Sequence, residues 1–220
     1  LSREGVNWSV TKLNWIAKVA SAPKLWFVGA NSRITSAADA IRAEQVVWPA
    51  TGPADNISDV AAVLSHVIGL KSKIVVGYKG AGDMSLAVIR GEADTGVLSI
   101  DSAIKLVESG QLRPLAILDT RRWPGLPNVP TLDEAARVDP AKAWMQLLRN
   151  EIGEVQRALV AAPNVPATRV AFLRTIAAQI LTDPDVIAEG KRTGRDIDFM
   201  AGAELQKHIS ELMGRAAPRI

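Results

Sequence analysis

The residue types that carry enzyme chemistry are sparse in this 220-residue sequence. It contains no cysteine, which excludes disulfides, thiolate nucleophiles and cysteine-ligated metals. The two histidines, His66 and His208, have no partner motif, and the serine-hydrolase elbow, the zinc-protease motif and the phosphate-binding loop are all missing. A lone histidine in an amphipathic stretch is more often a helix-surface residue than a general base. The sequence therefore predicts no catalytic residue, no metal site and no cofactor.

Three polar or glycine-rich loops are better candidates for a binding site. Each follows a predicted strand and precedes a predicted helix, where free backbone amides and the positive end of the helix dipole favour anions. The spacing G-x-x-G-x-G from Gly77 to Gly82 differs from the dinucleotide-binding G-x-G-x-x-G. The candidate ligand-binding residues are Thr51, Gly52 and Asn56 in the first loop, Tyr78, Gly80, Ala81 and Gly82 in the second, and Asp101 and Ser102 in the third.

Each of these loops could also have a purely structural role. A turn often needs glycine for a positive φ, and a polar residue there often caps the next helix. Tyr78, the only tyrosine, could stack on a ligand or cover the core. The carboxylates of Asp83, Glu92 and Asp94 stand in polar helical surroundings, which favours solvated or capping roles over acid–base catalysis.

The segments that must position these loops alternate between strand and helix. Short β-branched runs predict strands, and segments with apolar residues at helical spacing predict helices between them. In the helix over residues 57–68, Asn56 is the expected N-cap and Gly69 the stop. This alternation is typical of βαβ units and a parallel sheet. The predicted strands are residues 24–28, 45–48, 73–77, 95–100 and 112–118, and the helices after them include 57–68, 83–90 and 102–109, the last capped by Asp101.

The remainder of the chain is predominantly helical. Residues 123–130 are rich in proline and glycine and therefore irregular, and residues 131–134 form a capping box that opens a helix. A strand is expected at residues 155–161. Further helices are predicted at residues 143–149, 167–181, 184–192 and 203–213, with Asp183 capping the third of them.

Composition narrows the class of protein further. An apolar fraction of 48% with 22% charged residues is that of a globular chain and not of a disordered one. The net charge is only +3, with 26 basic residues scattered among 23 acidic ones, so nucleic-acid binding is not expected. No apolar run is long enough for a transmembrane helix, and the start at Leu1 does not resemble a signal peptide.

Six segments, in order along the chain, resemble one known family. They are similar to the "GYxG" and "LAxxRGExD" stretch, the "SGKLRPLA" strand, the "LPdVPTlxE" loop, the "aPpgvPa" helix entry and the "lxDPe" helix start of Bug-type proteins. These are the periplasmic solute-binding components of tripartite tricarboxylate transporters. The segments are residues 76–80, 86–94, 109–116, 126–134, 161–166 and 181–185.

The resemblance implies a type II periplasmic-binding-protein fold, with two α/β lobes and a hinge. It assigns residues 41–142 to lobe II, and residues 1–40 and 143–220 to a first lobe that is incomplete in this chain. It also implies a periplasmic ligand carrier that binds a small organic acid, delivers it to membrane permease subunits and is not an enzyme. Thr95 and the loop over residues 51–55 depart from the family's commoner glycine and "TGxGS" patterns.

Other functions share parts of this pattern. The effector-sensing domain of a transcription regulator has the same two-lobed fold, but it would need a DNA-binding helical module, and the sequence contains none. A metabolic enzyme on an α/β sheet would need a nucleophile, metal or cofactor constellation. A degenerate homologue that binds no solute would keep the architecture without the pocket.

Overall fold

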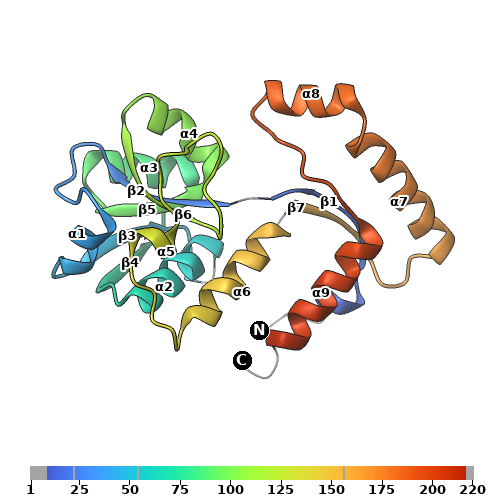
Figure 1. The fold of residues 1–220 in the computed structure, drawn as a ribbon, viewed down its shortest axis with the longest axis horizontal. Helices are drawn as coiled ribbons and strands as arrows, with labels where there is room; N and C mark the ends of the chain where they lie inside the picture. Colours follow the sequence, from blue (N-terminus) through green and yellow to red (C-terminus); the bar gives the residue numbers. More distant parts are fainter. Residues whose placement is uncertain (1–8, 22, 54, 156, 217–220) are drawn as a thin grey trace. The chain divides into compact units, whose positions relative to one another are not determined.

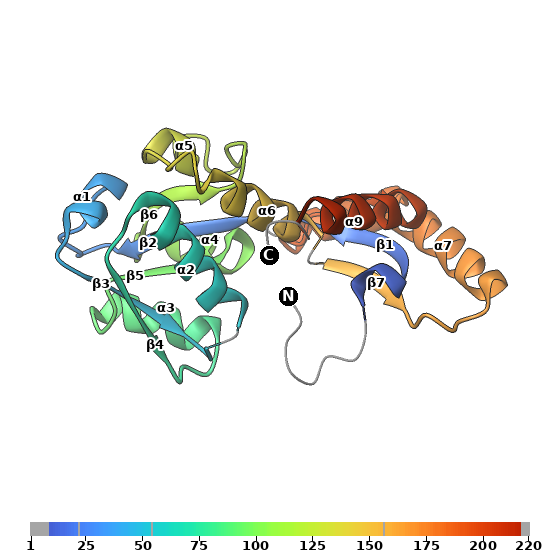
Figure 2. The same cartoon turned by 90° about the horizontal axis from the view of Figure 1, so that it is seen from below.

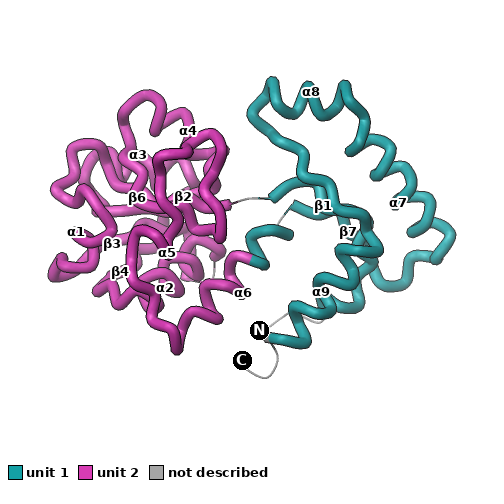
Figure 3. The backbone as a smooth tube through the Cα atoms, in the orientation of Figure 1, with its two compact units in different colours: residues 1–22, 151–220 teal, residues 23–150 magenta. Residues whose placement is uncertain are grey.

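The computed structural model describes residues 9–21, 23–53, 55–155 and 157–216, and it consists of two compact units (Figure 3). Unit 1 comprises residues 1–22 and 151–220, and unit 2 comprises residues 23–150. These boundaries differ from the predicted lobe bounds at 40/41 and 142/143. The reason is that strand β2 (Lys24–Gly29) pairs with strands of unit 2 along its whole length, so the residues that follow Ala22 belong with that unit.

Unit 2 consists of strands and helices in alternation (Figure 1). Helix α5 (Leu132–Ala135) forms a short turn after the proline-rich segment, and α6 (Ala143–Glu154) follows it along the chain. The strands after β2 are β3 (Val46–Ala50), β4 (Ser72–Val76), β5 (Thr95–Ser99) and β6 (Leu112–Leu118). The helices are α1 (Ala37–Arg42), α2 (Asn56–Ile68), α3 (Ala81–Arg90), α4 (Ile100–Glu108), α5 (Leu132–Ala135) and α6 (Ala143–Glu154).

The prediction of a parallel sheet is wrong at β2. This strand lies between β5 and β6 and runs antiparallel to both, whereas β3 and β4 are parallel, as expected of strands joined through α2. A parallel neighbour requires a crossover connection, usually a helix. The chain reaches β2 directly from the preceding strand of unit 1, so no crossover fixes its direction. Periodicity in the sequence carries no information on strand direction.

Asp94 joins the β3–β4 pair to the larger sheet. Its Oδ2 accepts a hydrogen bond of 2.8 Å from Val47 N, and its own N–H donates to Val47 O over 3.0 Å. Asp94 immediately precedes β5, and Val47 is the second residue of β3, so the two strands begin side by side. The loops that follow β3, β4 and β5 therefore leave the sheet at the same edge.

Helices cover both faces of this sheet (Figure 2). Side chains alternate along β2, with Trp26 and Val28 packed in the cluster beneath α2 and α5, and Leu25 and Phe27 in the cluster beneath α3 and α4. All four are essentially inaccessible to solvent. A strand that is buried on both faces and paired on both edges is the centre of the unit.

A buried polar network lies in the middle of β2. The indole N–H of Trp26 donates to Thr95 Oγ1 over 2.8 Å, and Thr95 Oγ1 donates to Phe27 O over 2.6 Å. The rings of Trp26 and Trp48 stack with centroids 6.1 Å apart and an interplanar angle of 23°. Thr95 is therefore a core residue whose hydroxyl satisfies two buried groups.

Unit 1 is built on a small antiparallel sheet, in the strand order β7 (Arg157–Ala161), β1 (Asn14–Ala20) and β8 (Met200–Ala201), and the 3₁₀ turn η1 (Val10–Lys12) precedes the central strand. Lys18 in the central strand is only 3% exposed, and its ammonium lies 2.7 Å from Asp198 Oδ2. Gly202 begins α9 so close to the sheet that an added Cβ would lie 2.3 Å from Ile16 O. The elements are η1 (Val10–Lys12), β1 (Asn14–Ala20), β7 (Arg157–Ala161), β8 (Met200–Ala201), α7 (Ala167–Leu181), α8 (Pro184–Arg192) and α9 (Gly202–Ala216).

Replacing Thr95 with valine tests the network around β2. Valine keeps the shape of threonine but leaves the Trp26 indole N–H and the Phe27 carbonyl without their shared partner, so the free energy of unfolding falls by about 1–3 kcal/mol. Urea denaturation followed by far-UV circular dichroism measures this loss. Thr95→Ser keeps the hydroxyl and loses only a methyl group, so it should cost less than Thr95→Val. Equal losses in the two variants would contradict a role for the hydroxyl.

Candidate functional site

The three predicted ligand loops all lie at the carboxyl ends of strands in unit 2. Thr51 and Gly52 follow the end of β3 at Ala50, the Gly77–Gly80 loop follows the end of β4 at Val76, and the first turn of α4 follows β5. The Tyr78 N–H donates to Ala50 O over 3.2 Å, which holds the first two loops side by side. In an open α/β sheet, ligands bind outside this edge.

The first loop is closed on itself by Asp55. One carboxylate oxygen of Asp55, Oδ2, accepts from Thr51 N over 2.8 Å, from Gly52 N over 3.1 Å and from the Thr51 hydroxyl. The other oxygen, Oδ1, accepts from Ser58 N over 2.6 Å. Asp55 is thus the N-cap of α2, one residue before the predicted cap Asn56, which is the first residue of the helix. The amides of Thr51 and Gly52, expected to face a ligand, are bonded to this side chain.

These hydrogen bonds hold Asp55 ionised. Burial of the carboxyl raises its pKa, but the bonds from Ser58, Thr51 and Gly52 outweigh that effect and lower the pKa from its ordinary value of 3.8 to about 2. The folded-state pKa is the lower one, so the stabilisation from this cap is fully present above about pH 4. It is lost as the pH falls toward 2.

The second loop leaves its helix end open. Gly80 is the N-cap of α3, and no side chain caps the helix. The carboxylate of Asp83 turns back to accept from Lys79 N over 3.1 Å, within the loop. Ala81 and Gly82, the first residues of α3, are exposed. Tyr78 is half-buried and packs against the core beneath α3 and α4, so the core-covering role suggested for it is present in the structure.

The third loop is capped differently from the prediction. Ser99 is the N-cap of α4 and makes no side-chain capping bond, whereas Asp101, the predicted cap, is the second helical residue. An acid in the first turn still interacts favourably with the helix dipole. The hydroxyl groups of Ser99 and Ser102 lie 2.9 Å apart. Of the two residues predicted for this loop, Asp101 is half-buried and Ser102 is exposed.

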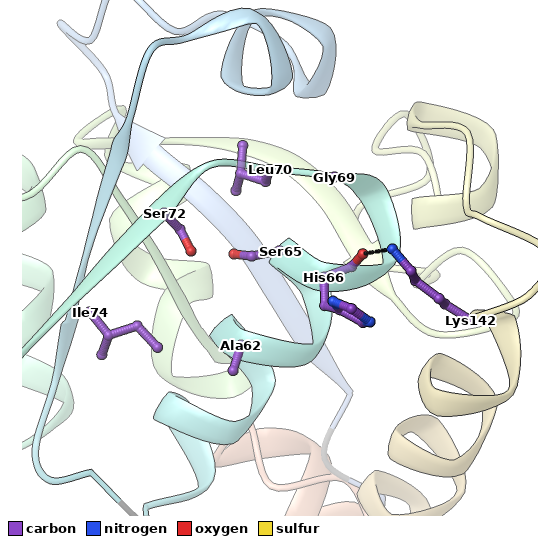
Figure 4. Close-up of a pocket in the computed structure, with 8 residues that line it drawn as sticks. All are labelled: Ala62, Ser65, His66, Gly69, Leu70, Ser72, Ile74 and Lys142. Carbon is purple, nitrogen blue, oxygen red and sulfur yellow. Dashed lines mark hydrogen bonds between the residues drawn. The ribbon is translucent and has the colours of Figure 1, made fainter.

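A hollow in unit 2 lies away from these loops. It has a volume of about 630 Å³ and sits at the C-terminal end of α2, where β4 begins (Figure 4). Helix α2 has 13 residues at about 1.5 Å each, so its C-terminal end is about 20 Å from its start beside Asp55. No predicted site residue lines it. The lining residues are Ala62, Ser65, His66, Gly69, Leu70, Ser72, Ile74 and Lys142.

The one charged side chain that lines this pocket, Lys142, is held by contacts within the protein. Lys142 Nζ donates to His66 O over 3.3 Å and lies 3.4 Å from Asp139 Oδ2. The hydroxyl groups of Ser65 and Ser72 point toward one another in Figure 4, and the buried Ser65 hydroxyl has no hydrogen-bond partner among the described residues. His66 is exposed. The pocket therefore presents two hydroxyl groups and an apolar wall, with no nucleophile–base pair among the residues that line it.

Metal sites and membrane-spanning helices are both absent from the described residues. Among them, no group of three or more histidine, aspartate or glutamate side chains is placed to hold a metal ion. In the same part of the chain, no helix is both long and apolar enough to cross a membrane.

Comparison with known proteins decides the family. The model of the tripartite tricarboxylate transporter family receptor matches residues 3–216. This chain belongs to that family. The family is one of receptors, in agreement with the prediction of a ligand carrier and not an enzyme. Comparison with curated protein sequences yields no match.

Solved structures of the same kind share the fold of this receptor-family chain. A solute-binding protein from Polaromonas, solved without ligand, superposes with a TM-score of 0.69 at 17% identity, over 96% of this chain and 69% of its own. An R. palustris protein solved with adipate gives a TM-score of 0.74 at 20% identity, over 99% of this chain and 71% of its own. MatC from Rhodopseudomonas palustris, solved with malate, gives a TM-score of 0.71 at 16% identity. The superposition covers 96% of this chain and 71% of the MatC chain.

These likenesses confirm the predicted fold class. The chain has the type II periplasmic-binding-protein fold, and part of the fold in the solved chains has no counterpart in it. The residue that sequence reasoning missed is Asp55. The sequence did contain a signal for Asp55, because aspartate and asparagine are equally good N-caps and both occur here, at positions 55 and 56. Only the helix start, fixed by the structure, decides between them.

Titration of the Asp55 carboxyl tests the geometry of the first loop. With a pKa of about 2, Asp55 stays about 90% ionised at pH 3, whereas a carboxyl of ordinary pKa would be mostly protonated there. NMR should show the amide protons of Thr51, Gly52 and Ser58 almost unmoved between pH 6 and pH 3. The same amides in Asp55→Asn provide the reference without a titrating group. If the shifts of these three amide protons titrated together in the wild-type chain with a midpoint near pH 4, the hydrogen bonds to the Asp55 carboxylate would not be formed.

Proposed function

We propose that this chain is the extracytoplasmic solute receptor of a tripartite tricarboxylate transporter and that it carries a small organic acid to the membrane permease subunits. Membership of the receptor family is the observation that carries the proposal. A receptor of this kind requires a ligand site and a docking surface for the permease, but no catalytic group. The location that we propose for this receptor is the periplasm.

The choice of an organic acid has two supports. Two structures with the same fold were solved with adipate and with malate, both of which are carboxylates. In this chain, α3 begins at the sheet edge with Gly80, Ala81 and Gly82 and has no side-chain cap, while the Asp83 carboxylate in its first turn accepts from Lys79 N and so turns back into the loop. The first amides of a helix have no partner within it, and together with the helix dipole they favour an anion.

The β4–α3 loop is therefore the proposed anchor for a ligand carboxylate. Gly80 gives the ligand access to the helix end, since nothing lies within 4 Å of the position a Cβ would take there. The first turn of α4, with Asp101 and Ser102, and the Thr51–Asn56 segment border the same edge and complete the proposed site in unit 2. The exposed Ser102 in the first turn of α4 would orient the remainder of the ligand.

Thermal denaturation with a panel of mono-, di- and tricarboxylates tests the ligand class. A ligand at 100 times its dissociation constant stabilises the protein by about 2.7 kcal/mol, which raises the melting temperature measurably. We expect at least one small carboxylate to do so, and uncharged analogues of the same size to have no effect. The absence of a shift with every carboxylate would remove the proposed ligand class.

A substitution at Gly80 tests the proposed anchor directly. Gly80→Asp places a carboxylate at the N-cap of α3, where aspartate is a favoured residue, so the fold should be kept while the ligand carboxylate meets a like charge on its amides. Binding measured by calorimetry should weaken about tenfold or more. Ser109→Asp makes the same charge change at the exposed far end of α4 and should leave binding unaltered. Unchanged affinity in Gly80→Asp would place the anchor elsewhere.

A further inference from the structure

A buried lysine in unit 1 takes no part in the candidate site. Lys18 lies in β1, the central strand of the unit 1 sheet, and is only 3% exposed. Its Nζ lies 2.7 Å from Asp198 Oδ2 and 3.9 Å from Glu154 Oε2. Lysine is almost never fully buried unless its charge is paired. The two carboxylates explain how the ammonium is tolerated in the sheet, but they do not explain why a lysine stands there.

Stability is a weak explanation for this cluster of charges. Taking two charges out of water costs about as much as their attraction returns, so an apolar replacement of a buried ion pair is often neutral or stabilising. The side chains of Asp198 and Glu154 are 55% and 42% exposed, so water can hydrate both carboxylates in the absence of Lys18. The role of the ammonium is therefore better sought in the segments that it joins.

The segments that Lys18 joins are those next to the two connections between the units. Unit 1 is discontinuous in sequence, so the chain passes between the units twice, at residues 22/23 and 150/151. Ser21 lies directly before the first connection, and its hydroxyl donates to Asp198 Oδ2. Glu154, the last residue of α6, lies shortly after the second.

Asp198 is itself fixed to the sheet. Its N–H donates to Val19 O over 2.9 Å, so the residue lies beside the end of β1. Its Oδ2 then receives both the Lys18 ammonium and the Ser21 hydroxyl. The last residues before the first connection are therefore held by a carboxylate that is bonded to β1 twice, once through its backbone and once through Lys18.

We propose that Lys18 is a conformational clasp that ties both connections to the sheet of unit 1. Through Asp198 and Ser21 it holds the chain before the first connection, and through Glu154 it holds the end of α6 after the second. A movement of either connection is then not passed on into β1. This role goes beyond the proposed receptor function and does not depend on the ligand class or on the anchor at Gly80.

Lys18→Met tests the clasp, because methionine keeps an unbranched side chain and removes the charge. Amide hydrogen exchange of residues 19–21 and 152–155, followed by NMR, should accelerate about tenfold or more, as expected when hydrogen bonds to charged groups are lost. The midpoint of urea denaturation should stay the same, since both carboxylates can be hydrated. Lys207→Met removes an exposed ion pair with Glu211 in α9 of the same unit and should change neither measurement.

Two milder variants separate the two connections. Ser21→Ala removes only the hydroxyl bond to Asp198, so it should accelerate exchange at residues 19–21 and leave residues 152–155 unchanged. Glu154→Gln removes only the second carboxylate charge and should have the opposite pattern. Both side chains lie outside the buried core, so the fold should be kept even if Lys18→Met does not fold.

The freedom of the connections can also be measured directly. The chain contains no cysteine, so spin labels can be placed on Thr168→Cys in α7 of unit 1 and Lys105→Cys in α4 of unit 2, both at exposed positions. Pulsed electron–electron double resonance then gives the distribution of distances between the labels. Lys18→Met should broaden this distribution, because the released connections gain freedom, whereas Lys207→Met should leave its width unaltered.

Two results would overturn the clasp. The first is unchanged exchange at residues 19–21 and 152–155 together with an unchanged distance distribution in Lys18→Met, because the ammonium would then not hold the connections. The second is faster exchange in all strands of unit 1 to the same degree, with a lower urea midpoint, because Lys18 would then support the sheet as a whole. Identical exchange patterns in Ser21→Ala and Glu154→Gln would likewise contradict separate ties to the two connections.

Discussion

Strand β2 is bonded on both edges and buried on both faces, and this constraint governs unit 2. Nothing around it can be hydrated, so each polar group must find a partner inside the protein. Thr95 supplies that partner twice, as acceptor for the Trp26 indole and donor to Phe27 O. Asp94, the preceding residue, joins β3 to the start of β5. Two adjacent residues therefore set the place of the strands whose ends carry the candidate site.

The motifs that relate this chain to its family are mostly structural. Arg113 of the "RPL" strand donates to the carbonyls of Ala30, Ser32 and Ile34 and fixes the segment after β2. In the proline-rich segment, Glu134 accepts from Thr131 N and Arg122 Nε, each over 2.8 Å. Caps and links of this kind are determined locally by sequence, so they identify the fold even at about 20% identity or below. They say little about the ligand, because their hydrogen bonds are made within the protein.

The predictable parts of the fold are those determined locally. The bounds of α7 and α8 follow from their flanking proline and aspartate signals and agree with the structure, as does the capping box at Thr131. Strand β1 could not be predicted, because its buried Lys18 is neutralised by Asp198, a residue far away in sequence. The direction of β2 and the core role of Thr95 also depend on distant partners. At the candidate site, the sequence located the loops, but it placed the caps of α2 and α4 at neighbouring residues.

Those neighbouring residues determine the chemistry of the site. An N-cap may be aspartate, asparagine, serine or glycine with little difference in the stability of the helix. The same choice determines whether the helix start presents bare amides, a neutral cap or a negative charge to a ligand at the sheet edge. The fold should therefore tolerate a substitution at Gly80, whereas under the proposed function a carboxylate there would compete with a ligand carboxylate for the same donors. A receptor family built on this edge could thus change its ligands at the cap positions and leave the buried network around β2 unaltered.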